Sequence, residues 1–272
     1  MTTTVSYWIN EYGSTMDLWQ WGSGGGIIGV YRSSTGSTGT YAVVGQATGP
    51  VPSDSAGQPV ALSIFWRSLD GGEPDPSWNW VSGLGGQRLP VAGGQPETLL
   101  LNHALVATTP FPGLAQPGTY IDKLSYRPRF ASPAESAAAM VVGGTLSDPV
   151  VGVWQCREQP GLWLKLVVNI AALGAPGVNA TGIGFVTGSL VNGEGEQELI
   201  GLTDTGAAAS GLALQGLTLS AAVPGTVQTL SLSGSLDLST RVMTMTALTS
   251  QGTAPDATYV QTTVGTLTFV QA

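Results

Sequence analysis

The sequence predicts an all-β protein that consists of two tandem antiparallel domains. Short runs with period-two alternation or apolar character recur along the whole chain, as in strands whose successive side chains point to opposite faces. Clusters of Gly, Pro and Ser separate these runs, as expected of the turns between strands. This spacing is typical of an antiparallel barrel or sandwich.

Eight strands are expected in each half of the chain. The first eight lie near residues 4–10, 15–21, 26–32, 39–46, 59–67, 77–83, 97–107 and 118–127. The segment 127–149 breaks the pattern, and its Pro, Ala and Ser content predicts a linker with one helical turn at 133–140. The second eight lie near residues 150–156, 161–170, 181–190, 196–203, 209–221, 226–235, 240–249 and 258–270. We therefore expect one domain at 1–128, a linker at 129–149 and a second domain at 150–272.

The two halves also repeat one another. "IIGVYRSSTG" (27–36) aligns with "VTGSLVNGEG" (186–195), "AVVGQATG" (42–49) with "ELIGLTDT" (198–205), and "VSYWINE" (5–11) with "VGVWQCR" (151–157). A long internal repeat indicates duplication, and two tandem barrels are its simplest interpretation.

Composition excludes several classes of protein. A net charge of −8 argues against a nucleic-acid binder, which needs a basic surface. No apolar run approaches the ~20 residues of a membrane-spanning helix. The start "MTTTVSYW" has no signal-peptide features, so the chain as written is expected in the cytoplasm, although its localisation stays unknown. The single Cys156 forms no disulfide within the chain.

The first expected strand carries an unusual polar face. If the strand runs through "SYWINEYGSTMDL" (6–18), alternate positions place Trp8, Asn10, Tyr12 and Ser14 on one side. Such a face is too polar for an ordinary core. It therefore marks a candidate binding surface, with Trp8 closing the floor of the barrel.

Several motifs in the first half, taken in order, resemble the avidin/streptavidin family. "WINEYGSTMDL", "GVYRSSTG", "IFWRS", "WVSG" and "IDKLSYR" follow one another as the family's strand motifs do. The resemblance covers residues 5–127 well and 150–270 more weakly. It implies two tandem eight-stranded up-and-down barrels and a non-enzymatic protein that holds biotin inside the first. An eight-stranded barrel is wide enough for one small ligand.

The resemblance also implies which residues bind the ligand. Asn10, Ser14 and Tyr31 would donate to the ureido oxygen of biotin, and Tyr12 would narrow the cavity or add a phenol. Asp122 would accept a ureido N–H through a charge-assisted hydrogen bond. Ser33, in the loop 32–39, would bind the carboxylate of the ligand tail.

The apolar part of the expected site consists largely of aromatic side chains. Trp66 matches the family's Trp on the fifth strand, while Asn79 and Trp80 fall where the family has a hydroxyl and an aromatic. "SWNWVSG" has one residue too many, which leaves open whether Trp80 or Val81 faces the ligand. On the seventh strand, His103 or Ala104 stands where the family has a Trp.

The second half lacks the expected donors. Cys156 stands where Asn10 does, Leu190 where Tyr31 does, and Leu267 or Thr266 where Asp122 does. We therefore expect biotin binding in the first barrel only, with the second completing a pseudo-dimer and a homodimer of chains left open. No cofactor, metal site or catalytic residue is predicted, because His103, the single His, has no identifiable partner in the sequence.

Two alternatives stay open. Instead of binding biotin, the chain would be a lipocalin-like small barrel that binds or transforms another small ligand, or it would be a structural or interaction module. The first gains weight if Asp122 does not lie near Tyr31.

Overall fold

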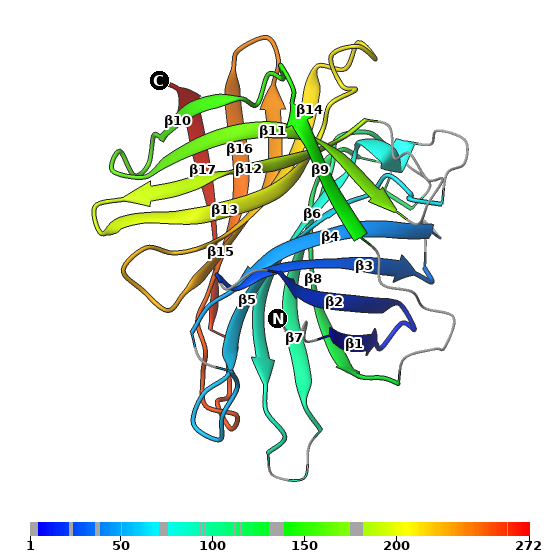
Figure 1. The fold of residues 1–272 in the computed structure, drawn as a ribbon, viewed down its shortest axis with the longest axis vertical. Coiled ribbons are helices and arrows are strands. Elements are labelled where there is room, and N and C mark those ends of the chain that lie inside the picture. Colours follow the sequence, from blue (N-terminus) through cyan, green and yellow to red (C-terminus); the bar gives the residue numbers. More distant parts are fainter. Residues whose placement is uncertain are drawn as a thin grey trace.

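The computed structural model describes residues 5–21, 24–35, 39–49, 51–70, 76–92, 94, 96–110, 113–114, 116–130, 139–174, 182–259 and 261–272. These residues form two closed eight-stranded antiparallel barrels in tandem, which confirms the predicted fold class. Figure 1 shows the barrels side by side, the first in blue to green and the second in green to red.

The first barrel follows an up-and-down order in which each strand pairs with the next and β1 pairs with β8. A short 3₁₀ helix, η1 (Pro76–Asn79), precedes the sixth strand. The strands are β1 (Val5–Asn10), β2 (Thr15–Trp21), β3 (Gly26–Ser33), β4 (Gly39–Ala47), β5 (Gln58–Phe65), β6 (Val81–Leu89), β7 (Thr98–Ala107) and β8 (Gly118–Pro128).

The second barrel repeats this order, and the pairing of β10 with β11 closes it. A ninth strand, β9 (Ala139–Thr145), pairs with the far part of β11 outside the ring. The strands of the ring are β10 (Gly152–Cys156), β11 (Trp163–Gly174), β12 (Ile183–Asn192), β13 (Gly195–Asp204), β14 (Leu214–Ala222), β15 (Thr229–Asp237), β16 (Val242–Ser250) and β17 (Thr262–Gln271).

The structure differs from the expected elements at two places. The sixth strand begins at Val81 rather than at 77, because residues 76–79 form η1, and it continues to Leu89. Within the expected linker, residues 139–145 form β9. The helical turn expected at 133–140 lies on residues outside the described part, apart from 139 and 140, which belong to β9.

Glycines aligned by the internal repeat occupy equivalent positions in the two barrels. A Cβ on Gly29 of β3 would lie 2.3 Å from the carbonyl oxygen of Asp17, and one on Gly188 of β12 would lie 1.8 Å from that of Lys165. No side chain fits at such a distance, so the close approach of neighbouring strands requires glycine in both barrels.

The two barrels pack wall against wall. Ser63 of β5 and Ser220 of β14 face each other with their Oγ atoms 2.9 Å apart, and the carbonyl of Ser82 accepts from Thr218 (3.0 Å). Ser63 and Ser220 hold equivalent ladder positions, so equivalent surfaces meet, as in an isologous dimer. An apolar cluster fills the contact: Ala42, Val44, Phe65, Leu69, Val81, Val106, Ile183, Phe185, Ile200 and Leu202.

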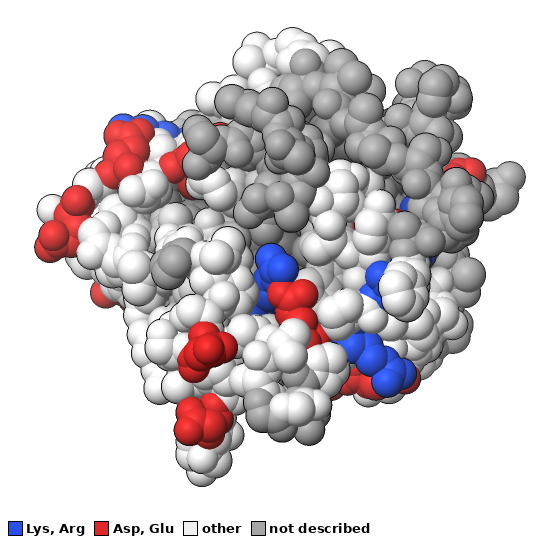
Figure 2. Space-filling model, turned by 60° about the horizontal axis from the view of Figure 1, so that its bottom comes forward, with Lys and Arg blue, Asp and Glu red and all other residues white. Residues whose placement is uncertain are grey.

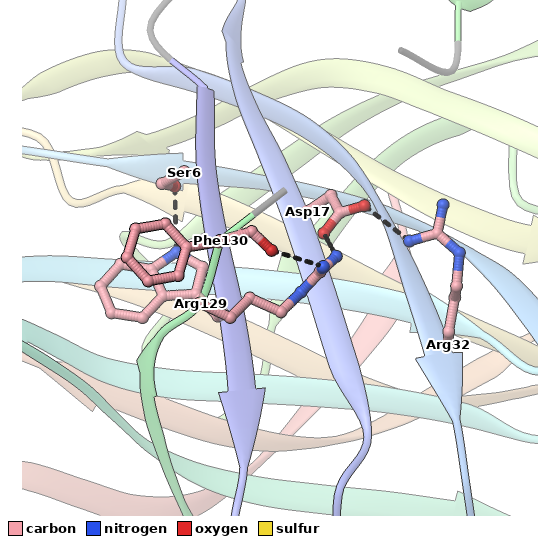
Figure 3. Close-up of polar contacts among 6 residues, drawn as sticks. Ser6, Asp17, Arg32, Arg129 and Phe130 are labelled. Atoms are coloured by element: carbon pink, nitrogen blue, oxygen red, sulfur yellow. Dashed lines mark hydrogen bonds and ion pairs between the residues drawn. The ribbon is translucent and has the colours of Figure 1, made fainter. Parts of the chain in front are cut away.

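A buried carboxylate fixes the outer wall of the first barrel. Asp17 of β2 is 1 % exposed and forms ion pairs with Arg32 of β3 (2.6 Å) and with Arg129, which follows β8 (Figure 3). The backbone N–H of Arg129 also donates to the carbonyl of Tyr7 (3.0 Å). The chain that leaves β8 is therefore fastened across β1 and β2.

Replacing Asp17 by Ala should lower the free energy of unfolding by about 3 kcal/mol, because two arginines would lose their shared buried partner. Urea unfolding of the full chain measures the change. Asp54→Ala removes an exposed carboxylate and should stay within about 0.5 kcal/mol of the original protein. Equal losses for the two variants would show that the ion pairs of Asp17 with Arg32 and Arg129 contribute no stability.

Candidate functional site

A tight turn connects β1 to β2 at the end of the first barrel that we call the mouth, where the β1–β2, β3–β4, β5–β6 and β7–β8 connections lie. The side-chain oxygen of Asn10 accepts from the backbone N–H groups of Tyr12 (3.1 Å) and Ser14 (2.9 Å). Gly13 has a φ of 83°, which favours glycine. This Asx-type turn holds Asn10 and Ser14 buried and leaves the Asn10 amide NH₂ as a donor.

Four polar side chains meet below this turn. Burial raises the pKa of Tyr31 above its ordinary value, while hydrogen bonding with Ser14, Tyr126 and Asn10 opposes the rise. Burial, followed by the charge of Tyr31, raises the pKa of Tyr126. The Tyr126 hydroxyl is fully buried, yet no neighbour has regular hydrogen-bond geometry to it. Both phenols are therefore protonated at neutral pH and can act as donors.

Aromatic rings adjoin this polar cluster. The Trp66 ring lies edge-on to Tyr31, with centroids 5.9 Å apart, and is tilted against Tyr41 at 4.9 Å. Trp80 is buried in the same interior cluster, and its Nε1 donates to the carbonyl of Thr109 (3.0 Å). The interior thus combines donors with flat apolar surfaces.

A second polar group lies on β6, β7 and β8. Trp66 Nε1 donates to Ser82 Oγ (2.7 Å), and His103 Nε2 lies 2.8 Å from the same oxygen. His103 stands directly opposite Asp122 in the β7–β8 ladder. Burial lowers the pKa of His103 to about 4, against the opposing effect of the Asp122 carboxylate. The imidazole is therefore neutral at pH 7.

The structure brings together most of the predicted donors but not Tyr12. Asn10, Ser14 and Tyr31 meet, and Trp66 contacts Tyr31. β1 ends at Asn10, so Tyr12 lies in the turn, where it is 53 % exposed rather than on the inner face of a strand. The alternation assumed from the sequence fails because the turn interrupts the strand.

Ser33, Asn79 and Asp122 lie apart from the four-residue cluster. The Ser33 hydroxyl donates to the carbonyl of Thr35 (2.7 Å), within its own loop. Asn79 lies in η1, where its carbonyl accepts from Thr108 Oγ1 (2.8 Å). Asp122 is exposed, and the carboxylate that acts on Tyr31 is that of Glu11. The binding roles of these residues stay predictions.

The structure settles two alternatives that the sequence left open. Trp80 lies in the interior of the first barrel, whereas Val81 packs between the barrels. On β7, His103 shares the inward face with Leu99 and Leu101, and Ala104 faces the second barrel, where its carbonyl accepts from Ser233.

Sequence reasoning missed Tyr41, Ser82 and Tyr126 as members of this site, and it left His103 and Ala104 as alternatives. Strand parity contains the signal for Tyr126 and His103. Tyr126 shares the face of Asp122 and Leu124, and it pairs with Asn10. His103 alternates with buried leucines. Ser82 and Tyr41 become visible only once the sixth strand and its register are known.

Equivalent ladder positions in the second barrel are apolar. Its interior is a continuous cluster around Trp154, the counterpart of Trp8. The counterpart of Asp122 is Gly265, and not Leu267 or Thr266 as expected. Gly265 pairs with Ala247, which is the counterpart of His103. The polar residues Asn10, Tyr31, Ser82, His103 and Tyr126 correspond to Cys156, Leu190, Leu230, Ala247 and Phe269.

The described residues contain few features of other kinds of site. No group of three or more potential metal ligands occurs among these residues. None of the helices in the described ranges is long and apolar enough to cross a membrane. On the face shown in Figure 2, acidic side chains are dispersed and basic side chains are few.

The residue types Ser82, His103 and Asp122 match those of a hydrolytic triad, so His103 does have the partners that the sequence did not reveal. However, Ser82 is completely buried, and its oxygen already accepts from Trp66. A nucleophile needs access to its substrate, which the burial of Ser82 denies in this structure.

Comparisons with known proteins do not identify a family for this chain. No protein-family model matches the chain, and no curated protein matches it. The crystal structure of a rhizavidin–biotin complex is similar at 20 % identity and a TM-score of 0.34, covering 46 % of this chain and 100 % of the rhizavidin chain. A similarity of this size carries no argument about function.

The low pKa of His103 predicts a pH-dependent stability. Between the ordinary value of 6.5 and about 4, the unfolded chain binds the proton that the folded chain excludes. The stabilisation is thus complete above pH 6.5 and is lost as the pH falls to 4, amounting to at most about 3 kcal/mol. Urea unfolding at pH 7, 5.5 and 4.5 measures it.

His103→Phe removes this group and should flatten the same profile between pH 7 and 4.5. An unchanged slope in this variant would assign the pH dependence to carboxylates instead.

Proposed function

We propose that the protein binds biotin, or a small molecule with a similar cyclic urea, without catalysis and inside the first barrel. The observation that carries the proposal is the meeting of Asn10, Ser14, Tyr31 and Tyr126 in a buried cluster. All four can donate a hydrogen bond. Several donors directed at one point suit a single strong acceptor, such as a urea carbonyl oxygen.

The hydroxyl of Tyr126 supports this proposal. It is buried beside Tyr31 and Asn10, but it has no hydrogen bond of regular geometry to them. A buried polar group that is poorly paired costs folding free energy. An acceptor on the ligand would give this hydroxyl a better partner on binding.

The aromatic rings supply the apolar part of the site. Trp66, Tyr41 and Trp80 lie next to the donor cluster and offer flat surfaces to the ring system and alkyl chain of a ligand. The pattern of a few convergent polar groups on an apolar wall is typical of small-molecule sites.

The second barrel has a structural role in this proposal. Its interior is filled by apolar side chains, and its wall buries the outer wall of the first barrel. It provides stability and no donors. The same packing favours a pseudo-dimer within the chain over a free interaction module.

A second candidate is a lipocalin-like carrier of another small ligand. Asp122 faces His103 and does not act on Tyr31, whereas a cyclic urea needs acceptors for its N–H groups near the donor cluster. A ligand with a carbonyl but no adjacent N–H fits the deep cluster equally well. Competition between biotin and simple cyclic ketones distinguishes the two candidates.

We predict that biotin raises the melting temperature of the full chain and that Tyr126→Phe weakens binding about tenfold. The same variant should change the stability of the unliganded protein by no more than about 1 kcal/mol, because the hydroxyl it removes has no hydrogen bond of regular geometry to Tyr31 or Asn10. Isothermal titration gives the affinity, and urea unfolding gives the stability.

Asn10→Ala and Ser14→Ala should also weaken binding, whereas Ser125→Ala, exposed on β8, is the matched control. Absence of both heat and thermal shift with biotin would refute the proposal. Loss of stability without loss of affinity in Tyr126→Phe would remove this hydroxyl from the site.

We also expect no enzymatic hydrolysis. The rate of p-nitrophenyl acetate cleavage by the full chain should equal that of the Ser82→Ala variant, because Ser82 is buried and already accepts from Trp66. A rate that falls in Ser82→Ala would make the protein an esterase.

A further inference from the structure

Trp66, Ser82 and His103 form a directional row of hydrogen bonds. The indole N–H can only donate, so it occupies one lone pair of Ser82 Oγ. Ser82 is completely buried, and its own O–H needs an acceptor. Among the described residues, that acceptor is Nε2 of His103, 2.8 Å away. His103 therefore accepts at Nε2 and carries its proton on Nδ1.

Asp122 lies beside this imidazole. Directly opposed residues of an antiparallel pair have Cβ atoms roughly 4.5–5.5 Å apart, and His103 and Asp122 are opposed in this way. Both side chains have the inward parity of their strands, shared with Leu101 and Leu124. One neutral N–H donor and one carboxylate acceptor thus stand next to each other.

This pair lies nearer the mouth than the donor cluster. β8 begins at the mouth with Gly118, reaches Asp122, and ends deeper in the barrel. Tyr126 lies four residues further on, about 13 Å along the strand. It is fully buried, whereas Asp122 is exposed. A ligand whose head group occupies the deep cluster has its far end near His103 and Asp122.

An amide group has the chemistry that matches this pair. Its carbonyl oxygen accepts from the Nδ1–H of His103, and its N–H donates to Asp122. A free carboxylate offers only acceptors, and its negative charge would meet that of Asp122. The pair therefore distinguishes the two forms of a ligand tail.

We propose that His103 and Asp122 recognise the outer end of the ligand and select an amide-linked conjugate over the corresponding free acid. The inference rests on the proposed function of the first barrel. The ligand class is a head group joined by an amide bond to an amine, such as a lysine side chain. Ala247 and Gly265, the counterparts in the second barrel, offer no such pair.

Titration of the full chain at pH 7 with biotin and with N-methyl biotinamide tests the selection. The amide should bind at least about tenfold more tightly than the acid. Asp122→Asn should remove most of this difference by improving acid binding, and His103→Phe should remove it by weakening amide binding. Ser125→Ala, on the outward face of β8, should leave the ratio unchanged.

A spectroscopic measurement on the unliganded chain tests the row itself. His103 is the single histidine, so ¹⁵N NMR of the imidazole reports one tautomer without assignment ambiguity. We expect Nδ1–H at pH 7, and a loss of this preference in Ser82→Ala.

The outcomes separate the two proposals. Equal affinity for acid and amide, or an Nε2–H tautomer, overturns this inference while the binding function stands. Failure of both ligands to bind overturns the proposed function and this inference together.

Discussion

The burial of β5 on both of its faces is the constraint on which the rest of the structure depends. Every residue from Gln58 to Phe65 is buried. One face, with Leu62 and Ile64, lines the interior of the first barrel, and the other, with Ser63 and Phe65, meets the second barrel. A shift of one residue would exchange the two faces and place a hydroxyl in the core. The contact between the barrels thereby fixes the register of β5. Because β6 pairs with β5, its register is fixed as well, and Ser82 lies on the inner wall.

The interiors of the two barrels differ in polarity. A buried hydroxyl that is poorly paired, such as that of Tyr126, and the desolvated imidazole of His103 both cost folding free energy. The second barrel has Phe269 and Ala247 at these positions and avoids both costs. Because the barrels share one apolar contact, the packed barrel offsets the costs of the polar one. A single eight-stranded barrel with the same interior would have less apolar burial to set against them.

Most strands were predictable from the sequence because turn residues and period-two alternation are local signals. β6 was misplaced at its start because the 3₁₀ turn at Pro76–Asn79 has aromatic residues on both sides of its Asn, which imitates a strand. The placement of Tyr12 on the inner face of a strand was wrong for a related reason. The side chain of Asn10 accepts hydrogen bonds from the turn that follows it, and the strand ends there. Tyr126 and His103 follow the inward parity of their own strands, but their placement beside Asn10 and Asp122 required the pairing of β8 with β1 and β7, which is a long-range property. The donors Asn10 and Ser14 were predicted because the motifs that contain them resemble those of a known family, although the turn between them was not foreseen.

The two barrels share their strand register at the positions that line their interiors, and they differ there in their side chains. Gly29 and Gly188 meet neighbouring carbonyl oxygens in the same way, and Ser63 meets its own counterpart, Ser220, across the contact. Duplication therefore preserved the strand register while the interiors changed. In such a framework, exchanging a polar side chain for an apolar one of similar size alters the site without moving a strand, as Tyr126 and Phe269 illustrate. The fixed backbone then makes chemical identity at a few inward positions the variable that distinguishes the two interiors, as Ala247 and Gly265 in place of His103 and Asp122 illustrate.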